Sequence, residues 1–484
     1  MRRLIPVVKG AFPAVIEGQV HRVLGLTAES NGLFAPVGGC CEICRRDGSR
    51  IRAEVVGFRQ DHAIVAPCGE IRGISAGDKI VYKGAKASVK VGPGLIGRVI
   101  DAEGRLMDNG PPIKGGVDVP LHRTGGNPLK RQRVDRVLVT GIRAIDGLLT
   151  VGCGQRMGIF SGSGLGKSVL LSMIARNTDA SIVVIGLIGE RGREVLEFVD
   201  KNLGTDGLRR AVVVAATGEE PALKRIQAAL VSTAVAEHFR DAGHDVLLLM
   251  DSLTRVATAQ RELGLSCGEP PATKGYPPSV FAMIPKLLER AGPAQRGSIT
   301  GFYTVLVEAD DHNDPVADCS RSAMDGQLWL AREAAERGHF PAIDPLSSLS
   351  RVQPNIVEPE HLSAVAAVRA HLSRYHQVED LLRLGAYVPG ADPAVDASIK
   401  LFPRIETYLR QEIHEASDFA TTVLRLKELV KTQALEARLA AGSRPQHSIR
   451  SFPARPDLKA GDRGEVSVEN AKTSLRARKR EVTA

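Results

Sequence analysis

Short apolar runs, separated by Gly, Asp and Pro, follow one another over the first 90 residues at a spacing of about 8–12 residues. Such spacing is typical of a small all-β barrel or sandwich, so we expect a β-barrel domain over residues 1–90. The predicted strands are Ala14–Val23, Gly32–Phe34, Ile51–Phe58, His62–Ala66 and Lys79–Tyr82. Residues 91–135 are rich in Gly and Pro and predict a connecting region.

The pattern changes at about residue 136, where apolar strands begin to alternate with helical stretches. Strands that are apolar throughout and lie between helices predict a parallel sheet covered on both faces, within a domain over 136–355. The predicted sheet strands are Gln155–Phe160, Ser181–Ile188, Ala211–Ala215, Asp245–Met250 and Ile299–Val307. Helical periodicity then predicts a helical domain over 356–440, with helices Pro359–Leu372, Tyr375–Leu384, Pro393–Leu409 and Asp418–Leu439.

Composition excludes several classes of protein. Of the 484 residues, 43% are hydrophobic and 25% charged, which is ordinary globular composition and excludes a mostly disordered chain. No apolar run approaches the ~20 residues that a membrane helix needs. Seven unevenly spread cysteines favour a reducing compartment over a disulfide framework, so we expect a cytoplasmic protein.

The net charge of +9 is partly local, because residues 441–484 carry ten basic and five acidic residues. We expect this basic tail to be flexible. A basic stretch is also a candidate contact for acidic lipid or nucleic acid.

The sharpest chemical signal is Ser161-Gly-Ser-Gly-Leu-Gly-Lys-Ser168, which lies between a predicted strand and a predicted helix. This is the context of a phosphate-binding loop, in which backbone N–H groups and the positive end of the helix surround the phosphates. Lys167 can reach the β- and γ-phosphates, and Ser168 can bind Mg²⁺. The usual pattern begins with Gly, whereas this chain has Ser161.

Two carboxylates follow predicted neighbouring strands. Asp251 ends the run Asp245–Met250, where it can hold Mg²⁺ beside the loop. Ser252, rather than a catalytic Glu, comes next, so the water-activating acid must lie elsewhere, and Glu190 at the tip of its strand is the best candidate.

Hydrolysis also needs positive charge on the transition state. Arg191, Arg193, Arg255 and Arg351 are candidates, and spacing alone does not choose among them.

Several longer motifs reveal a resemblance. They are Gly158–Ser168, Ile188–Glu194, Leu249–Arg255, Gly268-Glu-Pro-Pro-Ala-Thr-Lys-Gly-Tyr-Pro-Pro-Ser279, Phe340-Pro-Ala-Ile-Asp-Pro345, Ser350-Arg351 and Leu384-Gly-Ala-Tyr-Val388. Over roughly residues 14–440 the sequence resembles the ATPase of the flagellar type III export apparatus, within the superfamily of rotary ATP synthase catalytic subunits.

The resemblance implies an α/β fold: a RecA-like P-loop core with a parallel sheet, an N-terminal β-barrel domain and a C-terminal helical domain. It implies ATP and Mg²⁺ as cofactors. It also implies that Glu190 activates water and that Arg351 reaches a neighbouring subunit's site as an arginine finger. Lys167 and Arg191 complete the expected catalytic set, and Ser168 and Asp251 form the expected metal site. The expected nucleotide-binding residues are Gly162, Ser163, Gly164, Leu165, Gly166, Lys167, Ser168, Val169, Phe340 and Tyr387, of which the two aromatic residues would flank the adenine.

The implied partners are five further copies of the chain in a homohexamer, a stator-like regulator, a central stalk, a membrane export gate, and export substrates with their chaperones. We expect a protein that is peripherally associated with the inner membrane export apparatus. Flagellar members usually carry a longer amphipathic N-terminal helix, whereas here only about 13 residues, including Pro6 and Pro13, precede the barrel. That departure puts the usual docking of the regulator in doubt.

Four alternatives stay open. The main one is the ATPase of a virulence (injectisome) secretion system. An ATP synthase catalytic subunit fits the 268–279 loop poorly. An RNA translocase fits poorly because only 4% of residues are aromatic, so we expect no nucleic-acid partner. A non-catalytic nucleotide-binding subunit would not need Glu190.

Overall fold

The computed structural model describes residues 15–123, 129, 131–307, 311 and 313–442. It divides into two units, Met1–Ala437 and Arg438–Ala484. The predicted basic tail lies outside the described residues from position 443 onward.

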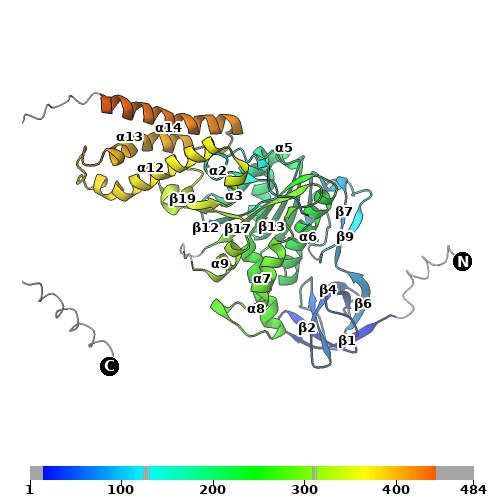
Figure 1. The fold of residues 1–484 in the computed structure, drawn as a ribbon. Helices are drawn as coiled ribbons and strands as arrows, with labels where there is room; N and C mark the ends of the chain where they lie inside the picture. The colour runs from blue at the N-terminus through cyan, green and yellow to red at the C-terminus, as the bar shows by residue number, and fades with distance from the viewer. Residues whose placement is uncertain (1–14, 124–128, 130, 308–310, 312, 443–484) are drawn as a thin grey trace, which may run out of the picture. The chain divides into compact units, whose positions relative to one another are not determined.

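Six antiparallel strands close into a barrel near the N-terminus (Figure 1, blue). They are β1 (Glu17–Leu24), β2 (Thr27–Asn31), β3 (Gly39–Cys44), β4 (Arg50–Arg59), β5 (His62–Pro67) and β6 (Lys79–Lys86), in the order β1-β2-β5-β4-β3-β6. Alternate side chains such as Ile43, Val55 and Ile80 fill its interior, as the two-residue period of a strand requires.

Several local predictions about the barrel are wrong, and one of them is that no strand is predicted over Thr27–Asn31, which forms β2. Gly32–Phe34 is not a strand, because Gly32 takes a left-handed turn with φ of +72° and Phe34 is 85% exposed. The run Gly39–Cys44, for which no strand is predicted, forms β3 with Cys41 and Ile43 buried.

The central domain is built on a nine-stranded sheet, with the order β19-β18-β12-β17-β15-β13-β14-β8 and with β16 paired to β17. Six of its pairings are parallel, and only β18–β19 and β16–β17 are antiparallel. The strands are β8 (Arg98–Asp101), β12 (Arg156–Ser161), β13 (Ile182–Glu190), β14 (Ala211–Thr217), β15 (Asp245–Asp251), β16 (Gly292–Pro293), β17 (Ser298–Leu306), β18 (Gly326–Leu330) and β19 (Ile343–Ser350).

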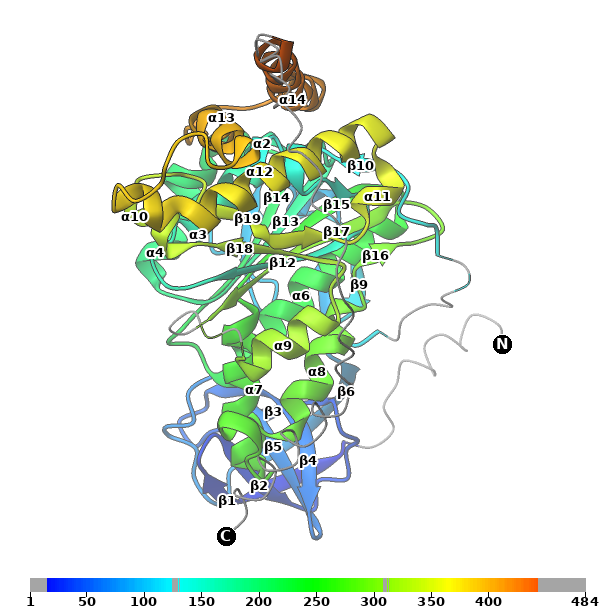
Figure 2. The same ribbon diagram turned by 60° about the vertical axis from the view of Figure 1, so that its left-hand side comes forward.

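Helices cover both faces of this sheet (Figure 2). On β15, Leu248 packs in the cluster that includes α6 (Ala222–Asp241), α7 (Leu253–Cys267) and α8 (Pro278–Leu288), whereas Leu247 packs in the cluster that includes α2 (Arg143–Leu148) and α3 (Lys167–Asn177). Successive residues of a strand point to opposite faces, so a strand that is buried on both faces is mostly apolar.

Smaller elements complete the chain up to the last helices. They are β7 (Ser88–Val91), β9 (Val117–Pro120), β10 (Val137–Leu138), β11 (Val151–Gly152), α4 (Gly192–Glu197), α5 (Gly204–Leu208), α9 (Pro315–Ser322), α10 (Arg332–Glu336) and α11 (Gln353–Ile356).

Three long helices follow the sheet: α12 (Pro359–Arg383), α13 (Pro393–Leu409) and α14 (Phe419–Gly442). The sequence predicts two helices where α12 runs as one, because Ser373 and Arg374 continue the helix without a break. No helix in the described ranges is long and apolar enough to cross a membrane.

Arg143 links the sheet domain to the helical region. This buried side chain donates from Nε to the Tyr408 carbonyl oxygen at 2.8 Å and also bonds to the Arg410 carbonyl and the Glu415 carboxylate. Its backbone N–H donates to Gln411 Oε1 at 2.9 Å. One buried side chain therefore bonds three acceptors at and just after the end of α13, of which the Tyr408 carbonyl oxygen is buried.

We expect Arg143→Met to destabilise the protein by about 2–4 kcal/mol, because it removes every hydrogen bond of a buried guanidinium and leaves the buried Tyr408 carbonyl without its donor. Urea unfolding followed by circular dichroism measures this. The matched control is Arg209→Met, which breaks an exposed 3.3 Å pair with Asp206 and should cost less than about 0.5 kcal/mol. Equal effects of the two substitutions would show that the helical region docks without Arg143.

Candidate active site

The loop between β12 and α3 forms one wall of a cavity of about 490 Å³. Gly164 and Gly166 adopt φ values of +82° and +80°, a left-handed conformation that glycine adopts readily. No side chain caps the start of α3 at Gly166, so its first N–H groups stay available to an anion. The structure brings all eight predicted loop residues to this cavity: Gly162, Ser163, Gly164, Leu165, Gly166, Lys167, Ser168 and Val169.

Two carboxylates meet the Lys167 ammonium group in the same cavity. Lys167 Nζ lies 2.6 Å from Asp251 Oδ1 and 3.8 Å from Glu190 Oε1. The acids come from neighbouring parallel strands, in which Leu187 pairs with Asp251, so both strand ends reach the same edge of the sheet. Asp251 is 2% exposed, and its Oδ1 also accepts a 2.8 Å hydrogen bond from Thr304 Oγ1.

The pKa of the Glu190 carboxyl group lies near neutral pH. Burial, followed by repulsion from Asp251, raises its pKa to about 7, and the Lys167 charge opposes this rise. Its buried Oε1 atom has no hydrogen-bond partner among the described residues. A carboxyl group with such a pKa can gain or lose a proton near neutral pH, as an acid–base catalyst must.

Glu194 is a site residue that the sequence reasoning missed. The pKa of Glu194 is lowered, and the largest cause is a side-chain hydrogen bond with Glu190, so the two carboxyl groups interact directly. The chain turns into α4 at Gly192 and brings the first-turn Glu194 back to Glu190. The acid four residues after Glu190 in the 188–194 motif was the available signal.

Oxygen groups in the cavity suit Mg²⁺. The exposed Ser168 hydroxyl and the Asp251 carboxylate are the hard ligands that this ion prefers, and unpartnered Glu190 Oε1 adds a nearby acceptor. The residues present therefore fit a magnesium ion bound with phosphate.

Phe340 lies against the loop because β19 is antiparallel. Ile343, at the start of β19, pairs with Leu330, and Leu330 pairs with Ser161 at the end of β12. A Cβ atom on Gly166 would lie 3.5 Å from Phe340 Cε1, and the ring is 42% exposed. The ring is placed to contact a base bound above the loop.

Tyr387 is held elsewhere by its hydrogen bonds. It lies on the connection between α12 and α13, and its hydroxyl donates to Asp396 Oδ1 at 2.9 Å. These contacts fix the ring at the start of α13 and do not link it to the loop.

Arg351 lies near the end of the sheet at which β12 begins, whereas the loop follows the other end of β12. Ser350, the last residue of β19, pairs with Gly326, whose parallel partner Met157 precedes Ser161 by four residues, or about 13 Å. The exposed Arg351 side chain cannot serve the loop of its own chain from there.

The other candidate arginines differ in position. Arg191 is 87% exposed and lies 3.7 Å from Glu194, and Arg193 is also exposed. Arg255 lines the cavity next to the two carboxylates.

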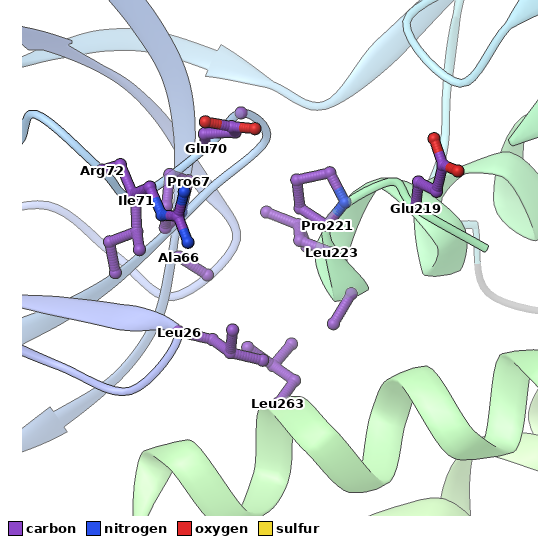
Figure 3. Close-up of a pocket in the computed structure, with 12 residues that line it drawn as sticks. Leu26, Ala66, Pro67, Glu70, Ile71, Arg72, Glu219, Pro221, Leu223 and Leu263 are labelled. Carbon is purple, nitrogen blue, oxygen red and sulfur yellow. The ribbon is translucent and has the colours of Figure 1, made fainter. Parts of the chain in front are cut away.

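A second pocket, of about 350 Å³, lies between the barrel and the sheet domain (Figure 3). Leu26 from the barrel, Leu223 from α6 and Leu263 from α7 give it an apolar lining, with Glu70 and Glu219 at its rim. It offers neither a glycine loop nor a lysine to phosphate, so the chemistry belongs to the loop cavity.

Comparison with known proteins agrees with this geometry. Residues 141–350 match the nucleotide-binding domain of the ATP synthase alpha/beta family, and residues 357–428 match the C-terminal domain of the type III secretion ATPase EscN. A flagellum-specific ATP synthase of Pseudomonas aeruginosa is 49% identical over 425 residues, which cover 86% of this chain and 93% of that protein. The chain belongs to the ATP synthase alpha/beta family of ATPases.

Other relatives come from both branches of the family. A type 3 secretion system ATPase of Xanthomonas euvesicatoria is 47% identical over 407 residues, covering 84% of this chain and 92% of that protein. The assembled EscN ATPase of enteropathogenic E. coli is 43% identical, with a TM-score of 0.82 over 85% of this chain and all of that one. The predicted fold class, family and ATPase activity are thus confirmed.

We expect Glu194→Gln to move the acid limb of the kcat/KM profile for ATP to lower pH. In the wild type, Glu190 is protonated below a pKa of about 7 and cannot accept a proton from water, so kcat/KM falls as pH drops through that range. Glu194 raises this pKa by its charge and its hydrogen bond, and an amide removes its charge.

Steady-state ATPase assays between pH 5.5 and 9 measure the pH at which kcat/KM falls on the acid side. Asp206→Asn, an equivalent change at an exposed acid on α5, should leave it in place. An acid limb that stays fixed in Glu194→Gln would show that Glu194 does not set the pKa that limits the reaction.

Proposed function

We propose that the chain hydrolyses Mg-ATP as the ATPase of a flagellar type III export apparatus, and couples hydrolysis to the delivery or unfolding of export substrates at the membrane export gate. The Lys167 ammonium group between two carboxylates carries the hydrolysis part of this proposal. The flagellum-specific names of relatives from several bacteria favour the flagellar branch. A virulence secretion system is the second candidate, since the Xanthomonas protein is similarly close.

The loop and Lys167 bind the β- and γ-phosphates, so Lys167 exchanges its contact with Asp251 for phosphate oxygens. Asp251, released from the lysine but still held by Thr304, is then free to hold a metal ion together with Ser168. Mg²⁺ supplies neutralisation of phosphate charge when bound. Phe340 packs against the adenine, with Tyr387 as the expected second aromatic residue.

Glu190 orients the attacking water and accepts its proton when ionised. Its free Oε1 atom is the acceptor available for that water. Glu194 holds the carboxyl group in place, and Arg191 adds positive charge beside it.

The position of Arg351 supports a ring of subunits. An arginine finger that cannot reach its own loop can complete a neighbouring site, which places each active site between two chains. EscN is known as an assembled ATPase and in complex with its central stalk EscO. By analogy we propose a homohexamer that binds a central stalk, with a stator-like regulator, the export gate, substrates and chaperones as further partners at the cytoplasmic side of the inner membrane.

We propose the following domain ranges: a barrel over 1–90, a connection over 91–135, an ATP-binding domain over 136–355, a helical domain over 356–440 and a basic tail over 441–484. Within the connection, β8 contributes one strand to the sheet of the ATP-binding domain.

ATPase activity per mole should rise with protein concentration, because each site needs two chains. We expect Glu190→Gln and Arg351→Ala each to lose at least about 100-fold in kcat, through loss of the base and of the finger respectively. Added RNA should change nothing. Flat activity per mole with a normal Arg351→Ala variant would refute the shared site, and strong stimulation by RNA would favour a translocase.

Mixing the two inactive variants tests the shared site directly. An Arg351→Ala chain keeps an intact Glu190, and a Glu190→Gln chain keeps an intact Arg351, so mixed rings contain some complete sites. We expect the mixture to recover activity that neither variant shows alone. If each site used its own arginine, no mixture would recover any.

A further inference from the structure

Ser161 is the first residue of the phosphate-binding loop, and its backbone is fixed on both sides. It pairs in parallel with Leu306 of β17 and with Leu330 of β18. Its carbonyl oxygen accepts a 3.0 Å hydrogen bond from the Val307 N–H. Its side chain can rotate, but its Cα atom cannot leave the sheet.

The side chain of Ser161 points to the face of the sheet from which α3 rises. Phe160 before it faces the other way and stacks on Trp329 with ring centroids 5.0 Å apart. Ile159 packs in the same cluster as Leu249 of β15, and by the two-residue period Ser161 and Asp251 continue these two rows. The Ser161 hydroxyl therefore lies under the loop, on the face that carries Asp251.

The hydroxyl has no hydrogen-bond partner in the described part of the chain. Ser161 is 1% exposed, and its Oγ atom is one of few buried side-chain atoms left without a partner. Other buried hydroxyls are satisfied: Thr304 donates to Asp251 at 2.8 Å, and Ser320 donates to the Val316 carbonyl at 2.6 Å. A buried hydroxyl without a partner raises the free energy of the state that contains it.

The groups that can supply a partner are those that rearrange when phosphate binds. The strands on either side are already paired with β12 at Ser161, whereas the loop backbone and Lys167 must change contacts to hold phosphate. We infer that the Ser161 hydroxyl gains a hydrogen bond from the backbone of residues 162–166 in the nucleotide-bound state, and that it thereby favours the bound loop over the empty one. This inference deepens the proposed function and rests on the nucleotide site being where it is proposed.

Such a hydroxyl acts in opposite directions on two measurable quantities. It destabilises the empty protein, where it has no partner, and it strengthens nucleotide binding, where it has one. An ordinary buried serine would stabilise the empty protein and leave binding unchanged. Ser161 is thus a positioning residue that biases the loop without touching the phosphates.

Ser161→Ala separates the two possibilities. We expect the melting temperature without nucleotide to stay equal or rise, and the Kd for Mg-ATP and for Mg-ADP to increase roughly 5- to 10-fold, as the net effect of one hydrogen bond predicts. Calorimetry measures both quantities on the full chain. Ser161→Gly should show the same rise in Kd.

Ser320→Ala is the matched control, because it deletes a buried hydroxyl that is already satisfied in the empty protein. It should lower the melting temperature and leave both Kd values unchanged. The inference is overturned if Ser161→Ala behaves like this control, or if its Kd values equal those of the wild type. Failure of the wild type to bind nucleotide at all would instead refute the proposed function.

Discussion

The Lys167 ammonium group is the charge on which the site depends. Two neighbouring parallel strands end in carboxylates at one edge of the sheet, and these would repel each other in a buried setting without a cation between them. The glycine loop exists to place that cation, since its left-handed residues turn the chain so that α3 starts at Lys167. When phosphate binds, Lys167 exchanges its contact with a carboxylate for a contact with phosphate oxygens, so the ammonium group is paired with negative charge in both states.

Burial of the sheet on both faces has a chemical consequence as well as a structural one. The apolar rows that pack against α3 and α7 keep water away from the strand ends, and this desolvation is the largest cause of the raised pKa of Glu190. The same packing therefore stabilises the domain and adjusts the proton affinity of the proposed catalytic acid. A looser sheet would lose both properties together.

Much of the fold and of the site could be predicted because the signals are local. The loop, the lysine and the acids at the strand ends can each be predicted from a few adjacent residues. The strands that are buried on both faces are recognisable because they are mostly apolar. What escaped prediction depends on contacts distant in sequence or on where the chain turns. The antiparallel direction of β19 decides where Phe340 and Arg351 lie, and no residue in that strand encodes its direction. Glu194 reaches Glu190 because α4 starts two residues after Glu190. In β3, it is Cys41 and Ile43 that fill the barrel.

Strand β19 begins near the loop and ends at the opposite end of the sheet, level with the start of β12. Phe340, just before the strand, contacts the loop, and Arg351, just after it, faces away. In a ring where Arg351 serves the next subunit, the eight residues of β19, about 27 Å long at ~3.4 Å per residue, link one nucleotide site to the adjacent one. A base that shifts the ring of Phe340 in one site would move the cation in the adjacent site, so neighbouring subunits could sense each other's nucleotide through eight residues of backbone.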